Sequence, residues 1–100
     1  MTSGNFIITQ EGTKLTIQGR IDSTNAVELG YTLDQVLKKG QTNIILNMLR
    51  VEYLCSTGIR MILKAYKEAL AAGGKLGIEM PSESVKNVLG IVALNEMLVE

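Results

Sequence analysis

The most constraining feature of this sequence is a central apolar run, Asn43-Ile44-Ile45-Leu46-Asn47-Met48, that lies between two amphipathic helix patterns. The run lacks a regular apolar–polar alternation, which is typical of a central strand covered on both faces. A helix between two strands usually carries the chain back to the same end of the sheet, so that the strands run parallel. The run and its flanking helices therefore predict an α/β fold.

Two long helices are predicted from apolar residues spaced three and four positions apart. The first is expected to begin with Ser23 or Thr24 as its cap and to end near Lys39, and the second to span residues 57–72. Their expected core positions are Ala26, Leu29, Leu33, Val36 and Leu37 in the first helix and Ile59, Ile62, Leu63, Tyr66, Ala69 and Leu70 in the second.

The remaining elements are shorter. Residues 5–10 and 13–19 are expected to form a hairpin, and residues 75–80 a strand with Leu76, Ile78 and Met80 on one face. A short helix is expected after Pro81-Ser82, and residues 97–99 are compatible with a last strand. We expect one domain over residues 1–100, with a mixed four- to five-stranded sheet, an N-terminal hairpin, parallel βαβ crossovers and about three helices.

This topology brings three separate segments to one edge of the sheet. The strands that end near Gly19, Met48 and Met80 are expected to be mutually parallel, so their carboxyl ends lie together. Open α/β sheets place their functional sites at this edge. The segments expected to meet there are residues 20–24, 53–58 and 81–82.

Composition limits the chemistry available to this site. Ten Lys and Arg residues balance ten Asp and Glu residues, which argues against binding to nucleic acid or to an anionic membrane surface. The absence of His and the single Cys55 argue against a metal site, a cofactor site and most enzymatic mechanisms, and leave a cysteine-dependent activity as the one enzymatic alternative. With no apolar run of about 18–20 residues and no signal-peptide pattern, we expect a cytoplasmic protein without membrane insertion.

Ser56 stands at the start of the second predicted helix and has two interpretations. The pattern alone favours a structural N-cap, because a Ser hydroxyl accepts a backbone N–H that the helix leaves unpaired. The functional alternative is phosphorylation, which would add about −1.5 to −2 charges at the positive end of the helix. The modification would then change the surface offered to a partner and leave the fold intact.

The segment Tyr53-Leu54-Cys55-Ser56-Thr57-Gly58-Ile59 resembles the signature of the STAS domain of bacterial anti-sigma factor antagonists, approximately aromatic–apolar–Asp–Ser–(Ser or Thr)–Gly–Leu. Four further segments are similar to family motifs in the same order. They are Gly19-Arg20-Ile21-Asp22, Leu46-Asn47-Met48, Ala72-Gly73-Gly74-Lys75, and Val88-Leu89-Gly90-Ile91 through Leu94, which is similar to the family's third helix and following turn. The resemblance extends over essentially the whole chain and implies a STAS-like fold.

The resemblance also implies a partner switch controlled by phosphorylation. In this family the unphosphorylated antagonist binds an anti-sigma factor, which is also a serine kinase of GHKL type, and thereby frees a sigma factor. Phosphorylation of the antagonist breaks the complex, and a PP2C-type phosphatase restores it. The acceptor position falls on Ser56, with Thr57 as the alternative. The residues expected at the partner surface are Asp22, Ser23, Tyr53, Leu54, Cys55, Thr57, Gly58 and Arg60.

Several of these positions also have a structural interpretation. Asp22 is equally well explained as a cap or turn residue of the first helix. For Thr57, packing in the first turn of the second helix is favoured over the acceptor role. Cys55 invites a redox interpretation because helix N-termini activate thiols, but a small, partly buried apolar role is favoured. Among Leu49, Val51, Tyr53 and Leu54, which we expect in a connecting segment, some are predicted to be buried and one or two to form an exposed docking patch.

Two departures from the family pattern favour a second hypothesis. Cys55 replaces the Asp that usually precedes the acceptor, and Leu49 and Arg50 replace acidic residues that often follow the central strand. Both changes remove negative charge from the region of the switch. The alternative is a constitutive STAS scaffold subunit of a larger signalling or lipid-transport complex.

Overall fold

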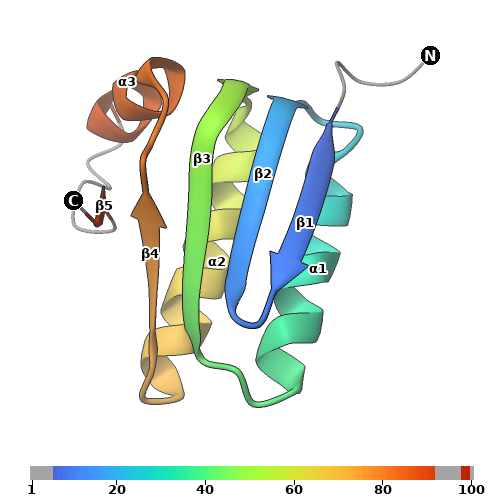
Figure 1. Cartoon of the computed structure of the whole chain (residues 1–100), viewed down its shortest axis with the longest axis vertical. Coiled ribbons are helices and arrows are strands. Elements are labelled where there is room, and N and C mark those ends of the chain that lie inside the picture. Colours follow the sequence, from blue (N-terminus) through green and yellow to red (C-terminus); the bar gives the residue numbers. More distant parts are fainter. Residues whose placement is uncertain (1–5, 92–97, 100) are drawn as a thin grey trace.

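The computed structural model of the chain describes residues 6–91 and 98–99. Strands and helices alternate after an N-terminal hairpin (Figure 1). The elements are β1 (Ile7–Glu11), β2 (Lys14–Ile21), α1 (Ala26–Lys38), β3 (Asn43–Leu54), α2 (Ser56–Ala71), β4 (Lys75–Glu79), α3 (Glu83–Ile91) and β5 (Leu98–Val99). Asn5 and Met97, which we expected at the ends of the first and last strands, lie outside the described residues.

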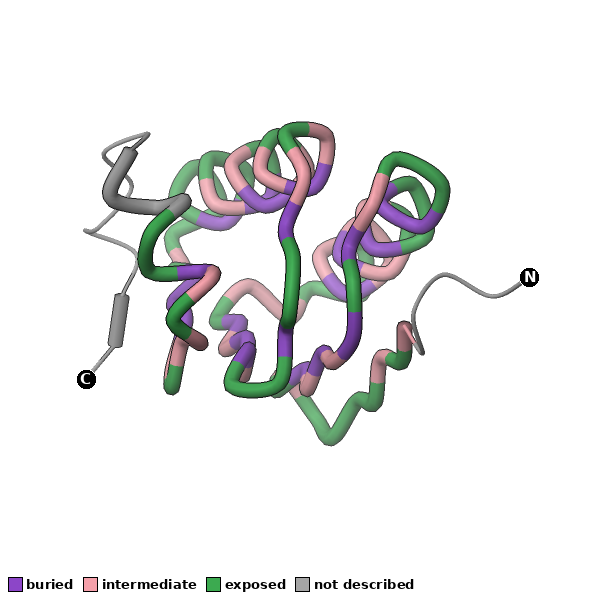
Figure 2. Tube along the Cα trace, turned by 90° about the horizontal axis from the view of Figure 1, so that it is seen from above, coloured by how far each residue is buried: buried purple, intermediate pink, exposed green. Residues whose placement is uncertain are grey.

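The strands form one five-stranded sheet in the order β1-β2-β3-β4-β5. β1 pairs with β2 in the antiparallel direction, and the other three pairings are parallel. The predicted hairpin, parallel crossovers and mixed sheet are confirmed. Both long crossover helices, α1 and α2, lie on the same face of the sheet (Figures 1 and 2). None of the helices within the described part of the chain is long and apolar enough to cross a membrane.

The core lies between the sheet and these two helices. In β2 the buried residues Leu15 and Ile17 alternate with more exposed ones, as predicted, and the strand continues past its predicted end to the buried Ile21. The expectation that residues 43–48 are covered equally on both faces is wrong. Ile44, Leu46 and Met48 are completely buried, whereas the intervening Ile45 and Asn47 are only half-buried, because α1 and α2 both pack on the same side of β3.

The helix core positions follow the prediction with one exception. In α1 the buried residues are Ala26, Leu29, Leu33 and Val36, and Leu37 packs against them half-buried. In α2, Leu70 is exposed, and the small residues Gly58 and Ala65 are buried instead, together with Ile62 and Ala69. The predicted core residues Ile59, Leu63 and Tyr66 pack against the core half-buried, so the fully buried stripe of α2 is narrower than the apolar pattern indicates.

The end of β4 also differs from the prediction. Leu76 and Ile78 are buried as expected, but β4 ends at Glu79 and Met80 is exposed. The backbone of Met80 takes a positive φ of 49°, an uncommon conformation for a residue with a side chain. The chain therefore turns at Met80, which takes this side chain off the face that carries Leu76 and Ile78.

Three polar side chains connect β2, β3 and β4 on the face opposite the helices. Lys14 Nζ lies 2.6 Å from Glu79 Oε2, and Asn47 Nδ2 donates a hydrogen bond of 3.3 Å to the same oxygen. The hydrogen bond from Lys14 is the main cause that lowers the pKa of Glu79 below its ordinary value of 4.5, with smaller help from the Lys14 charge and Asn47 and partial opposition from desolvation. The folded state therefore favours the Glu79 carboxylate.

This pair predicts a specific loss of stability in acid. Because folding lowers the pKa of Glu79, its contribution is present above pH 4.5 and is lost as the pH falls through the folded-state value. We expect Glu79→Gln to reduce the difference between urea unfolding midpoints measured at pH 7 and at pH 3. Lys14→Gln should give a similar reduction, and the double variant little more. An acid dependence in Glu79→Gln equal to that of the parent protein would contradict this assignment.

Candidate functional site

β3 continues past Met48 to Leu54, beyond its predicted end. Its pairing with β2 shifts register twice, between Thr16 and Gln18 and between Gly19 and Arg20 of β2. At each shift β3 holds an extra residue, which is the definition of a β-bulge. We expected residues 49–54 to connect two elements, and this was wrong, because a bulged strand does not show the two-residue period by which a strand is recognised.

The two bulges separate buried from exposed side chains at the end of β3. Val51 and Leu54 are buried against the helices, while Leu49 is 49% and Tyr53 41% exposed. The predicted mixture of buried and exposed residues in this segment is thus confirmed. The Arg20 guanidinium lies over the Tyr53 ring, 4.5 Å from its centroid, which is a favourable cation–π distance.

Ser82 fastens the start of α3 to the bulged part of β3. Its backbone N–H donates to the Met48 carbonyl at 3.2 Å, and its hydroxyl donates to the Val51 carbonyl at 2.6 Å. The same hydroxyl accepts the Val85 N–H at 3.2 Å and so caps the first turn of α3. The sequence placed Ser82 at this edge of the sheet but gave no sign of its bonds to β3.

The loop between β2 and α1 is held by Asp22 and Asn25. Asp22 Oδ1 accepts the N–H groups of Thr24 and Asn25 at 2.9 and 3.1 Å. The Asn25 side chain, only 6% exposed, accepts the Asp22 N–H at 2.9 Å and donates to the Arg20 carbonyl at 2.8 Å. The structure supports the turn interpretation of Asp22, whose carboxylate bonds backbone groups two and three residues ahead.

The cap of α1 differs from the prediction. Asn25 occupies the N-cap position, whereas Ser23 and Thr24 are exposed turn residues. The side chain of Asn25 makes no capping bond, because it is engaged with the loop that precedes the helix. Ser23 therefore lies open at the surface of the site.

Cys55, rather than Ser56, caps α2. The backbone of Cys55 is extended, with φ −80° and ψ 169°, and its Sγ accepts the Gly58 N–H at 3.4 Å. The Cys55 N–H in turn donates to the Ile21 carbonyl at 2.9 Å, which fixes the start of the helix beside β2. The structural interpretation of Ser56 as N-cap is therefore wrong, since α2 begins at Ser56 itself.

This shift of the cap leaves the Ser56 hydroxyl exposed. No hydrogen bond within residues 6–91 and 98–99 involves that hydroxyl. Thr57, by contrast, is half-buried, and its Oγ1 accepts a bond of 3.4 Å from Arg60 Nη2. Of the two candidate acceptors, Ser56 is thus the more accessible.

The structure divides the predicted partner-surface residues into two groups. Ser23, Tyr53 and Arg60 are exposed, and Asp22, Cys55 and Thr57 are half-buried. Leu54 and Gly58 are buried, and they support the site from below rather than face a partner. The expected convergence of residues 20–24 and 53–58 is confirmed by contacts between Arg20 and Tyr53 and between Ile21 and Cys55. Ser82 of the third segment bonds to β3 slightly earlier in the strand, at Met48 and Val51.

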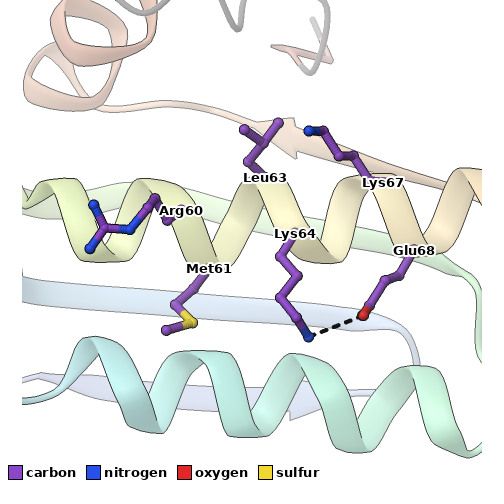
Figure 3. Close-up of a pocket in the computed structure, with 6 residues that line it drawn as sticks. All are labelled: Arg60, Met61, Leu63, Lys64, Lys67 and Glu68. Atoms are coloured by element: carbon purple, nitrogen blue, oxygen red, sulfur yellow. Dashed lines mark hydrogen bonds and ion pairs between the residues drawn. The ribbon is translucent and has the colours of Figure 1, made fainter.

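A hollow of about 540 Å³ lies along the solvent-facing side of α2 (Figure 3). The residues that line it all belong to α2 and are Arg60, Met61, Leu63, Lys64, Lys67 and Glu68. Lys64 Nζ pairs with Glu68 Oε2 at 3.0 Å, whereas Arg60 extends along the helix toward its N-terminal end. Within the described residues, no group of three or more His, Cys, Asp or Glu side chains is arranged to hold a metal ion.

Gly58 allows α2 to approach the sheet closely at the site. A Cβ atom added to Gly58 would lie 2.8 Å from Leu54 Cδ1 and 2.9 Å from Ile21 Cγ2, both on buried side chains. We expect Gly58→Ala to lower the free energy of unfolding by about 1–3 kcal/mol, measured by urea denaturation.

Gly30→Ala is the matched control for this prediction. Its new Cβ would meet the flexible end of Met61, and an interior helical Ala is favoured over Gly by about 1 kcal/mol. The two effects should largely cancel in Gly30→Ala. If Gly58→Ala is as stable as the parent protein, α2 is not held as closely to Ile21 and Leu54 as described.

The sequence is similar to that of a known protein. The "Putative anti-sigma factor antagonist BtrV" of Bordetella bronchiseptica is 32% identical over 60 residues, which cover 60% of this chain and 52% of BtrV. The chain thus spans about half the length of that relative.

Solved structures of one protein share the fold. The anti-sigma factor antagonist SpoIIAA in its unphosphorylated form is 20% identical, with a TM-score of 0.80 over 94% of this chain and 85% of SpoIIAA. The phosphorylated form of SpoIIAA, a Bacillus cell fate determinant, is also 20% identical, with a TM-score of 0.74 over 94% of this chain and 88% of that one. The sequence model of the STAS domain family matches residues 6–99, so the chain belongs to the STAS domain family.

Proposed function

We propose that this chain is an anti-sigma factor antagonist whose partner-binding surface surrounds Ser56 and is switched off when Ser56 is phosphorylated. The observation that carries the proposal is the state of the Ser56 hydroxyl. It is exposed at the first position of α2, and Cys55 has taken over the capping role that would otherwise occupy it. A hydroxyl in this state can enter the active site of a kinase without loss of a structural bond.

The surroundings of Ser56 supply a surface for a partner. Tyr53 and Ser23 are exposed on the two neighbouring segments, and Arg60 is exposed one helical turn further along α2. Tyr53 combines an apolar ring with a polar tip, a residue type enriched at protein interfaces. The bulges of β3 keep this ring at the surface while Leu54, next to it, stays in the core.

Two relatives support the same assignment. BtrV and SpoIIAA both carry the name anti-sigma factor antagonist, and SpoIIAA has been solved in phosphorylated and unphosphorylated forms. SpoIIAA is thus a protein with this fold that is phosphorylated. The position of Ser56 offers an acceptor for the same modification in the present chain.

The proposed modification is an ordinary phosphoryl transfer. Ser56 Oγ attacks the γ-phosphorus of ATP, the bond from that phosphorus to the bridging oxygen of ADP breaks, and the hydroxyl proton passes to a base of the kinase. The new group carries about −1.5 to −2 charges and lies at the positive end of α2, where it is compatible with the folded helix. A partner that packs against the neutral hydroxyl would then face a dianion.

The chain takes part in this chemistry as substrate and binding partner rather than as catalyst, since its sequence contains no His to act as a general base at neutral pH. We propose that the kinase is the anti-sigma factor itself, of GHKL type, and that a PP2C-type phosphatase removes the phosphate by hydrolysis. The expected setting is the bacterial cytoplasm.

A constitutive scaffold role is the second candidate. It is favoured by Cys55, which places a thiol where antagonists usually have Asp. It is also favoured by Leu49 and Arg50, which are exposed on β3 where the family often has acidic residues. In this role the same surface would bind a permanent partner without a phosphorylation cycle. Purification with a complex of several STAS proteins or a transporter, and without a kinase, would favour the scaffold.

The switch predicts a specific pattern of modification and binding. The protein would be incubated with ATP and the GHKL-type anti-sigma kinase of its own organism, and the phosphate located by mass spectrometry. We expect one phosphate on Ser56, none in Ser56→Ala, and an unchanged yield in Thr57→Ala. Ser56→Asp should weaken binding to the kinase about tenfold or more, as seen by calorimetry, because a charge enters the contact surface.

The outcomes separate the hypotheses. Phosphate on Thr57 alone would move the acceptor by one residue. Binding to the kinase with no phosphorylation, and with equal affinity in Ser56→Asp, would overturn the switch and favour the scaffold. For the phosphorylation measurement alone, Ser23→Ala serves as a control with an unchanged phosphate yield, because it removes another exposed hydroxyl from the same edge of the sheet.

A further inference from the structure

Arg60 lies on the same side of α2 as Ser56, one helical turn toward the C-terminus. Residues four positions apart on a helix are neighbours, and an acidic group N-terminal to a basic one is the more favourable order. The Arg60 side chain already reaches back toward the start of the helix (Figure 3). Its Nη2 donates a hydrogen bond of 3.4 Å to Thr57 Oγ1. A group attached to Ser56 would therefore lie within the range of this guanidinium.

The first turn of α2 offers Arg60 no acidic partner, and Glu68, further along the same helix, is paired with Lys64. That turn contains no acidic residue, and the cap is the thiol of Cys55 rather than a carboxylate. Asp22 belongs to the adjoining loop, and its Oδ1 is engaged by two backbone N–H groups. Arg20, another cation at this edge, lies over the Tyr53 ring, and Arg50 and Glu52 are both exposed on β3.

We propose that Arg60 is the residue that binds the phosphate on Ser56, and that its guanidinium leaves Thr57 to do so. This inference rests on the proposed phosphorylation of Ser56. The existing bond is long and joins the guanidinium to a neutral hydroxyl. Guanidinium–phosphate hydrogen bonds are charge-assisted and frequently bidentate, with roughly twice the strength of neutral ones. The exchange of partners is therefore favourable.

The other cations of α2 are less well placed. Lys64 is two turns from Ser56, about 12 Å along the helix axis, and it pairs with Glu68 at 3.0 Å. Lys67 is a further turn away. Across α2, Arg60 is thus the one cation within a single turn of the acceptor, and Lys67 provides a matched control that has the same charge on the same helix.

Phosphorylation would then change three features of the partner surface together. A phosphate is added to Ser56, the Thr57 hydroxyl loses its hydrogen bond to Arg60, and the Arg60 guanidinium binds the new phosphate. A partner that uses Arg60 as a contact loses that contact at the moment when the negative charge appears. The switch would act by withdrawing an attractive group as well as by adding a repulsive one.

The test uses protein with phosphoserine inserted at position 56 during translation, so that it does not depend on any kinase. The second pKa of the phosphate, about 6 in free phosphoserine, is measured by ³¹P NMR titration. We expect this pKa to be higher in Arg60→Gln than in the parent phosphoprotein by about 0.3 units, because a bound cation favours the dianion. Arg60→Lys should fall between them, and Lys67→Gln should match the parent.

Two results would overturn the proposal. One is a phosphate pKa in Arg60→Gln within 0.1 unit (a rough threshold) of the parent value. The other is an equal rise in Arg60→Gln and Lys67→Gln, which would indicate only the general charge of the helix. Thermal unfolding of each variant confirms that the fold is retained. Failure of the kinase to modify Ser56 would reject the proposed switch but leave this measurement intact.

Discussion

The bulged end of β3 is the constraint on which the site depends. A regular strand would place its side chains alternately toward the helices and away from them. The two extra residues allow Met48, Val51 and Leu54 all to be buried, and they leave Leu49 and Tyr53 exposed, with Tyr53 close in sequence to the start of α2. The bonds from Ser82 to the Met48 and Val51 carbonyls hold this geometry. The bulged end of β3 therefore contributes buried side chains to the core and exposed side chains to the surface of the site.

The parts of the fold that follow a regular period could be predicted from sequence. The stripe of α1, the alternation in β2 and the parallel crossovers were predicted because a repeated spacing reflects a repeated environment. The predictions failed where tertiary contacts replaced the period. The bulges interrupt the two-residue period in the last part of β3, so that this part could not be recognised as a strand. Because α1 and α2 pack on the same side of the sheet, one face of residues 43–48 is less buried than expected. The turn at Met80 moves its side chain away from the face that carries Leu76 and Ile78.

The site could be located from topology, but its bonding could not. The parallel strands were enough to bring residues 20–24 and 53–58 together and to place Ser82 against β3. The assignment of caps required coordinates, because Ser, Thr, Asp and Asn are all acceptable caps and several stand near each helix start. Cys is not a usual cap, and nothing in the sequence indicates that the thiol of Cys55 takes the Gly58 N–H. Because the Cys55 thiol caps α2, the Ser56 hydroxyl does not have that role and stays exposed.

The contrast between Ser56 and Ser82 has a consequence for selectivity. Both serines stand at the start of a helix on the same edge of the sheet, so a kinase that recognised only such a position would meet both. The Ser82 hydroxyl is occupied twice, as donor to the Val51 carbonyl and as acceptor of the Val85 N–H, and its modification would break the bond from that hydroxyl to β3. The fold thereby makes Ser82 a poor substrate and leaves Ser56 accessible. A kinase could distinguish the two serines in this way without reading the sequence around either of them.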